Sequence, residues 1–262
     1  MNYETLRLES SSIGVTRVIL SRPRYGNAYN GTMLCELLDI LENLKKDSSV
    51  RVVLFCGDGK NFQTGADINW LNEVRAKDSA ANESVSRETV CVMRSLDVLN
   101  KPTIAIVHGF CGGGGTGLIS ACDIVVAEKT ATFAISEARW GVSASIIFPM
   151  LNAAMGVRNV RRYALTCEQF TALRALEMGL VHEVVDVGRL EEFASQLIQQ
   201  ILRCSPKAIE LSKAGILRSC WTADSEMFDV LLNDHATARR SEDAKEGFAS
   251  FFEGRKASWS NH

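Results

Sequence analysis

Short apolar runs near the start of the chain alternate with stretches of helical spacing. Runs at residues 3–9, 14–20 and 51–56 predict strands, and a turn at 10–13 joins the first two. Between the second and third runs, apolar residues recur every three or four positions, which predicts a helix that packs one face on the core and begins at Asn30 or Thr32. These positions are Met33, Leu34, Leu37, Leu38, Leu41 and Leu44.

The middle of the chain repeats this alternation. Residues 76–88 are polar and predict an exposed segment that leads into a helix ending near Asn100. Strands are predicted at 103–107, 123–128 and 132–135, and a run of glycines separates the first two. Strands that alternate with helices are typical of an α/β domain with mostly parallel pairing.

The second half is mainly helical. Helices are predicted near 147–155, 158–165, 169–178, 189–203, 205–218 and 222–253, with one strand at 182–185. We therefore expect an α/β core over residues 1–190, which carries the active site, and a helical region over residues 191–262.

Composition and charge exclude several classes of protein. Of the 262 residues, 46% are hydrophobic and 23% are charged, with a net charge of −2, so a basic nucleic-acid-binding face is not expected. The eight cysteines show no C-x-x-C pair or metal-ligand spacing, which favours free thiols in a reducing compartment and no metal site. No apolar run is long enough to span a membrane, and no leader is visible, so we expect a cytoplasmic protein. The alternative is an organelle matrix, if a transit peptide has been removed.

Four consecutive glycines, Gly112 to Gly115, lie between the strand at 103–107 and a helix predicted to begin near Gly114. No Gly-Lys-Ser/Thr follows them, which argues against a phosphate loop. The dinucleotide pattern fits only loosely, because Asp123 comes too soon to be the ribose-binding acid. Free backbone N–H groups at such a turn could instead hold an oxyanion that forms during a reaction. The alternative is a tight structural turn.

A second glycine-containing loop, Thr64 to Asp67, also follows an apolar strand. Because the carboxyl ends of parallel strands meet at one edge, both loops are expected to line one site. Two N–H groups from separate loops can hold one oxygen, as suits a thioester carbonyl that becomes an enolate. Glu137 is the best acid–base candidate, since burial after a strand would raise its pKa, although a helix-starting role beside Ser136 is equally compatible. His108 is expected to be a packed structural residue.

Several longer segments, in order along the chain, identify a family. They are SRPRYGNAYN, NFQTGADINW, KPTIAIVHGFCGGGGTGLISACDIVVAE, FAISEARWG, ALEMGLVHEVV and FASFFEGRKASW. With these motifs the chain resembles the crotonase (enoyl-CoA hydratase/isomerase) superfamily over nearly its whole length. The resemblance implies an α/β, ClpP-like spiral of ββα repeats with a helical C-terminal trimerisation region. It also implies a coenzyme A thioester as substrate, no permanently bound cofactor, and a homotrimer or dimer of trimers.

The resemblance also assigns residues. It implies that the N–H groups of Ala66 and Gly114 form the oxyanion hole and that Glu137 is the catalytic acid–base. The implied substrate and coenzyme A contacts are Ala28, Ala66, Asp67, Ile68, Asn69, Gly113, Gly114, Gly117 and Lys256, the last of them on a neighbour's coenzyme A phosphates.

One position departs from the family pattern. Ordinary hydratases of this family carry two glutamates, and the first is expected at position 117, where this chain has glycine. The motifs GADINW, SEARWG and RKASW resemble methylglutaconyl-CoA hydratases of leucine breakdown, which favours an enoyl-CoA hydratase. An isomerase or decarboxylase that uses a single glutamate, an aromatic acyl group as in hydroxycinnamoyl-CoA hydratase-lyases, and a weakly catalytic coenzyme A-binding protein are the alternatives.

Overall fold

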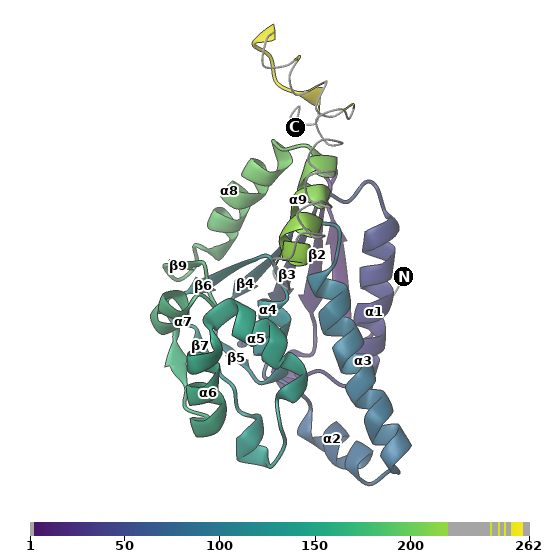
Figure 1. The fold of residues 1–262 in the computed structure, drawn as a ribbon, viewed down its shortest axis with the longest axis vertical. Coiled ribbons are helices and arrows are strands. Elements are labelled where there is room, and N and C mark those ends of the chain that lie inside the picture. The colour runs from purple at the N-terminus through teal and green to yellow at the C-terminus, as the bar shows by residue number, and fades with distance from the viewer. Residues whose placement is uncertain (1–2, 220–241, 243–245, 247–248, 250–252, 259–262) are drawn as a thin grey trace.

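A computed structural model describes residues 3–219, 242, 246, 249 and 253–258, and the predicted helix at 222–253 falls almost wholly outside them (Figure 1). The larger sheet has the strand order β1-β2-β3-β4-β6-β9. The β1–β2 pair is antiparallel and the other pairs are parallel, as the alternation of strands and helices predicted. Its strands are β1 (Leu6–Ser10), β2 (Val15–Leu20), β3 (Val52–Gly57), β4 (Thr103–Val107), β6 (Ile124–Glu128) and β9 (Glu183–Val185).

A smaller sheet contains β5 (Phe110–Gly112), β7 (Thr132–Ala134) and β8 (Phe170–Thr171). The sequence did not predict β5 or β8. The predicted helix at 169–178 begins later, because Phe170 stacks on Phe133 of β7, at 5.7 Å between ring centroids, and Thr171 accepts a hydrogen bond from Arg174 N. β7 pairs with β5 in parallel and with β8 antiparallel, so it lies at the centre of this sheet.

The helices surround the larger sheet (Figure 1). They are α1 (Gly31–Lys46), α2 (Ile68–Arg75), α3 (Ser79–Asp97), α4 (Gly114–Ser120), α5 (Phe148–Met155), α6 (Val157–Thr166), α7 (Ala172–Met178), α8 (Leu190–Leu202) and α9 (Pro206–Ser219). Short 3-10 helices are η1 (Pro23–Tyr25), η2 (Glu137–Trp140) and η3 (Ser145–Ile147). Asn30, one of the two predicted caps, accepts a hydrogen bond from Met33 N at 3.0 Å and starts α1.

The segment at 76–88 is largely exposed, as predicted, but most of it is helical, so the helix that ends near Asn100 begins earlier than the sequence indicated. α3 begins at Ser79 because Asp78 caps it, accepting a hydrogen bond from Ala81 N at 2.8 Å. The first half of α3 is largely exposed, and its apolar face is buried only from Thr89 onward. The polar sequence therefore reflects exposure of a regular helix rather than an irregular segment.

Two apolar clusters enclose the larger sheet. One joins one face of the sheet to α1, α3, α4, α5 and α7, and the other joins the opposite face to α8. α8 buries Leu190, Ala194, Ile198 and Leu202. The helical residues just after position 190 thus pack directly on the sheet, and the proposed division of the chain at that position stays a prediction.

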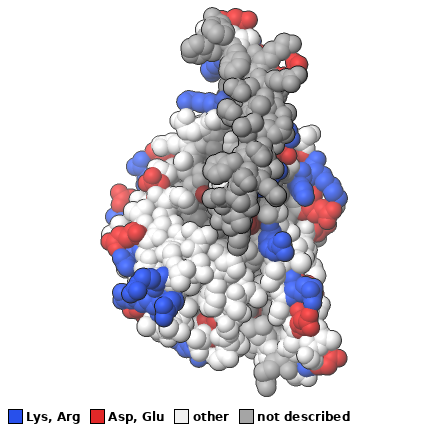
Figure 2. All heavy atoms as spheres, viewed as in Figure 1, with Lys and Arg blue, Asp and Glu red and all other residues white. Residues whose placement is uncertain are grey.

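Charged side chains lie mainly near the margins of the face in Figure 2, and the surface over α5 is largely uncharged. Within the described part of the chain, no helix combines the length and apolar character that crossing a membrane requires. The seven described cysteines are all free thiols, and no group of three His, Cys, Asp or Glu side chains in these residues has metal-binding geometry.

Candidate active site

Three segments that are far apart in the sequence lie side by side at the candidate site. Residue 29 pairs with Ala66, and Gln63 pairs with Cys111, as isolated parallel bridges. Gly112 N donates to Gln63 O at 2.9 Å, which fixes the loop at 61–66 along β5. The predicted meeting of the two glycine loops is therefore present.

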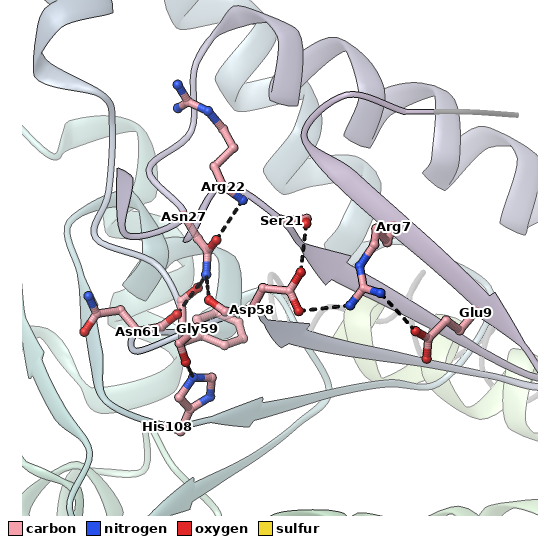
Figure 3. Close-up of polar contacts among 10 residues, drawn as sticks. Arg7, Glu9, Ser21, Arg22, Asn27, Asp58, Gly59, Asn61 and His108 are labelled. Atoms are coloured by element: carbon pink, nitrogen blue, oxygen red, sulfur yellow. Dashed lines mark hydrogen bonds and ion pairs between the residues drawn. The ribbon is translucent and has the colours of Figure 1, made fainter. Parts of the chain in front are cut away.

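Asn27 holds the loop that leads to Ala66 (Figure 3). Its buried side-chain amide donates to the carbonyl oxygens of Asp58 and Asn61, both at 2.8 Å, and its Oδ1 accepts from Arg22 N at 2.9 Å. His108 Nε2 lies 2.9 Å from Gly59 O in the same loop, as expected for a structural histidine. These contacts place the loop after β3 before any substrate binds.

Two backbone N–H groups at this junction, those of Ala66 and Gly114, are available to a ligand. Their neighbours are already engaged: the N–H of Gly113 donates to Ala134 O at 2.9 Å, and the N–H of Asp67 donates to the carbonyl oxygen of residue 29 at 2.8 Å. The N–H groups of Ala66 and Gly114, by contrast, have no acceptor among the described residues. The two loops touch, since a Cβ built on Gly65 would lie only 3.4 Å from Gly113 Cα and 3.5 Å from Gly114 N. Only glycine fits here without strain, because Gly65 also has a φ of +96°.

Glu137 lies beside this pair of N–H groups. Ala134 of β7 pairs with Gly112 of β5, and η2 begins three residues later with Glu137. A Cβ on Gly113 would lie 3.3 Å from Glu137 Oε1, so the carboxyl group reaches the backbone of the glycine turn.

The environment of Glu137 suits a proton-transfer group. The residue is partly buried, and its Oε2 is shielded from solvent with no hydrogen-bond partner among the described residues. Burial raises the pKa of Glu137, and the backbone N–H groups of Glu137 and Ser136 offset part of that rise. A carboxyl group with one unpaired oxygen beside two free N–H groups is arranged to move a proton next to a developing oxyanion.

Gly117, in the first turns of α4, faces Ile147 of η3. A Cβ on Gly117 would overlap Cγ2 of Ile147 and lie 2.8 Å from its Cβ. Ile147 is 1% exposed. The space that a side chain at position 117 would need is therefore already filled by an apolar group.

The matching family model is described as enoyl-CoA hydratase/isomerase, and it covers residues 10–262. The chain belongs to this family. A hydroxycinnamoyl-CoA hydratase-lyase from Pseudomonas fluorescens is 32% identical over 82% of this chain and 79% of that protein. A mitochondrial Delta(3,5)-Delta(2,4)-dienoyl-CoA isomerase from Dictyostelium discoideum is 30% identical over 97% of this chain and 91% of the relative.

A crystal structure of an enoyl-CoA hydratase from Shewanella pealeana superimposes with a TM-score of 0.93. It is 33% identical, and the match covers 98% of this chain and 96% of that one. The predicted crotonase fold is therefore confirmed, and the protein is an acyl-CoA-processing enzyme of the enoyl-CoA hydratase/isomerase family.

Several of the residues that the family resemblance assigned to coenzyme A lie in or beside the loop after β3. Ile68 and Asn69 are exposed at the start of α2. Asp67 is engaged within the protein, because its Oδ2 pairs with Arg22 at 3.0 Å and its Oδ1 accepts from Asn69 N at 3.0 Å. Ala28 is buried, and its carbonyl oxygen accepts from Arg22 Nη1 at 2.5 Å. Arg22 thus locks the two segments together, and contacts of these residues with coenzyme A stay predictions.

Lys256 is exposed near the C-terminus. The described residues of this part of the chain, yellow in Figure 1, lie beyond α9 and at the opposite end of the molecule from α2. Within one chain the structure does not bring Lys256 to the loop at 66–69, and its predicted contact with a neighbour's coenzyme A stays a prediction.

Two side chains at this site were missed by sequence reasoning. Tyr29 stands directly after Ala28 in the family segment SRPRYGNAYN, and nothing in the sequence singles it out. Ile147 was one apolar residue among several in GVSASIIFP, with no spacing signal that linked it to Gly117. Both contacts cross between elements that only the fold brings together.

Proposed function

We propose that this protein is an enoyl-CoA hydratase in which Glu137 is the only carboxyl group that transfers protons. The observation that carries the proposal is the meeting of an unpaired, buried carboxyl oxygen with two unpaired N–H groups. The N–H groups of Ala66 and Gly114 would hold the thioester oxygen. As in the sequence prediction, methylglutaconyl-CoA is the first acyl-CoA to test.

In the proposed reaction, the Glu137 carboxylate takes a proton from water while the water oxygen bonds to Cβ of the enoyl group. The electron pair of the double bond moves through the thioester, which becomes an enolate held by the two N–H groups. Protonated Glu137 then donates its proton to Cα, and the thioester carbonyl reforms. Water has been added, and Glu137 is again ionised. The raised pKa suits both halves of this cycle.

Isomerisation of an enoyl-CoA is the second candidate, and the packing of Ile147 against Gly117 favours it. With no second acid at that position, Glu137 could remove a proton from the acyl chain and return it to a different carbon through the same enolate. This reaction needs no bound water. Both proposed reactions pass through the same enolate. They differ in the source of the proton that Glu137 takes, which is water in hydration and the acyl chain in isomerisation.

A panel of enoyl-CoA thioesters, including methylglutaconyl, crotonyl and hydroxycinnamoyl thioesters, distinguishes these reactions by product mass. Hydration adds one water, isomerisation leaves the mass unchanged, and decarboxylation removes carbon dioxide. A product that gains water supports the hydratase. Tight binding of the whole panel without any product would contradict the proposal and favour a coenzyme A-binding protein without activity.

We also propose a homotrimer or a dimer of trimers in the cytoplasm. Large apolar side chains are exposed on the second half of the chain, including Leu165 at 78%, Trp140 at 61% and Leu173 at 59% exposure. Exposed apolar groups of this size commonly mark subunit interfaces. Light scattering coupled to size exclusion would give the mass, and a monomer at micromolar concentration would contradict the assembly.

A further inference from the structure

Tyr29 connects the two halves of the candidate oxyanion hole. Its backbone N–H donates to Gly65 O at 2.9 Å, and its carbonyl oxygen accepts from Asp67 N at 2.8 Å. These two bonds flank Ala66 and fix the direction of its free N–H group. The main chain of Tyr29 thus positions one of the two proposed donors.

The side chain of Tyr29 reaches the other donor. A Cβ built on Gly114 would lie 2.5 Å from Cε1 of the ring and 3.1 Å from the hydroxyl oxygen. The ring packs against the apolar core and meets Trp70 edge-on, with 6.1 Å between centroids. These contacts hold the ring against Gly114 and limit the positions open to its hydroxyl group.

The hydroxyl group itself is uncommitted. Among the described residues, no hydrogen bond is made by Tyr29 Oη, whereas Tyr3 donates to Asp39 at 2.6 Å. Burial raises the pKa of Tyr29, and the nearby negative charge of Glu137 raises it further. The phenol therefore stays protonated at neutral pH and is a hydrogen-bond donor without an acceptor.

We propose that the Tyr29 hydroxyl is a third hydrogen-bond donor to the thioester oxygen, beside the N–H groups of Ala66 and Gly114. The inference rests on the proposed enolate chemistry. No proton is transferred by Tyr29, and its O–H bond to the oxygen strengthens as negative charge develops there. Such a donor would stabilise the enolate more than the ground state, so it would act on kcat more than on KM.

Tyr29→Phe removes only the hydroxyl and keeps the ring that packs on Gly114 and Trp70. We expect kcat to fall about 10- to 100-fold with KM nearly unchanged, somewhat less than for a main oxyanion donor because two N–H groups remain. Tyr25→Phe is the matched control, because Tyr25 is 58% exposed in η1, and it should leave kcat unchanged.

A second readout tests which atom receives the hydrogen bond. A bound, conjugated dienoyl-CoA shifts its thioester carbonyl stretch to lower frequency when that oxygen is polarised. We expect the shift to be smaller in Tyr29→Phe than in the wild type and Tyr25→Phe. An unchanged kcat overturns the inference, and so does a lower kcat with an unchanged carbonyl shift. If the wild type itself neither polarises the carbonyl nor turns over any thioester of the panel, the proposed function has failed instead.

Discussion

Two acidic side chains of this protein, Asp123 and Glu137, are in opposite situations. Asp123, just before β6, accepts hydrogen bonds from Thr103 N and Oγ1, both at 2.8 Å, and pairs with Lys213 at 2.7 Å. It joins the starts of β4 and β6 to α9. Glu137, after β7, has a buried oxygen with no partner in the described chain. The first carboxylate holds three structural contacts through its Oδ2, and the second keeps one buried oxygen without a partner in the described chain.

The comparison teaches how to separate structural from catalytic acids. A paired, hydrogen-bonded carboxylate stabilises the fold, and losing its partners leaves charges uncompensated. An unpaired buried carboxyl group costs stability when it ionises, and proteins retain such groups where a reaction needs them. The two residues should therefore respond in opposite ways to the same kind of substitution.

Glu137→Gln should give the largest effect. Turnover of the best enoyl-CoA should fall about 100-fold or more, because the amide cannot accept and return the proton. The variant should unfold at a higher temperature than the wild type at neutral pH, since the cost of a buried ionised group is removed. Initial rates and thermal denaturation measure the two effects. A variant that keeps full activity would show that Glu137 is not the acid–base.

Asp123→Ala should reverse this pattern. It leaves the Lys213 ammonium, whose side chain is 10% exposed, without its carboxylate, and the free energy of unfolding should fall by about 2 kcal/mol. Turnover per folded molecule should change little. Lys213→Met is the control and should cost less, because Asp123 keeps both bonds from Thr103. Denaturant titration checks that stability falls from the wild type to Lys213→Met to Asp123→Ala. Equal stability of Asp123→Ala and the wild type would contradict this order.

Gly117→Glu tests whether a second acid can be restored beside Glu137. The side chain would overlap Ile147, so overpacking should lower the free energy of unfolding by about 1–3 kcal/mol without any gain in rate. Combining it with Ile147→Ala should recover part of that loss, because the methyl groups that clash are removed. Measuring Ile147→Ala alone as well completes a double-mutant cycle, which isolates the interaction free energy between the two positions. Additive losses would mean that the two positions do not compete for one space.

The pH dependence of stability and of kcat/KM that Glu137 causes is the smallest of the expected effects. Because the pKa of Glu137 is higher in the folded state than in the unfolded state, this group stabilises the folded state at low pH. That contribution to stability is lost as the pH rises from the pKa of the unfolded state through the pKa of the folded state. Because the carboxylate is the base, kcat/KM should rise with pH through the raised pKa, above the usual glutamate range. Measuring kcat/KM as a function of pH checks this. A rise centred near the ordinary glutamate pKa would contradict it.

Much of the architecture followed from local patterns. The strand at 103–107, the cap at Asn30 and the helix start at Gly114 are where the sequence predicted them. The two-residue strand β8 and the three-residue strand β5 were missed because so few residues carry no periodicity, and their pairing is decided by contacts with β7. The polar start of α3 was predicted only as an exposed segment, because its first turns do not pack on the core and so carry no apolar periodicity.

The candidate site was predictable in part. Glycines after strands and a glutamate after a third strand pointed to the two loops and to Glu137, since strand ends converge in α/β folds. The absence of a carboxylate at Gly117 was visible in the sequence. That Ile147 fills the space beside Gly117, and that Tyr29 contacts both loops, depends on packing between segments about 30 to 85 residues apart in the sequence.

The central claim is that Glu137 and the two N–H groups convert a bound thioester into its enolate, whichever reaction follows. A saturated thioester such as butyryl-CoA tests this directly, because it can neither be hydrated nor isomerised, but its Cα proton can exchange. In deuterated water, nuclear magnetic resonance should show deuterium entering Cα with the wild type and at a rate at least about 100-fold lower with Glu137→Gln. Equal exchange by the two proteins would contradict the account.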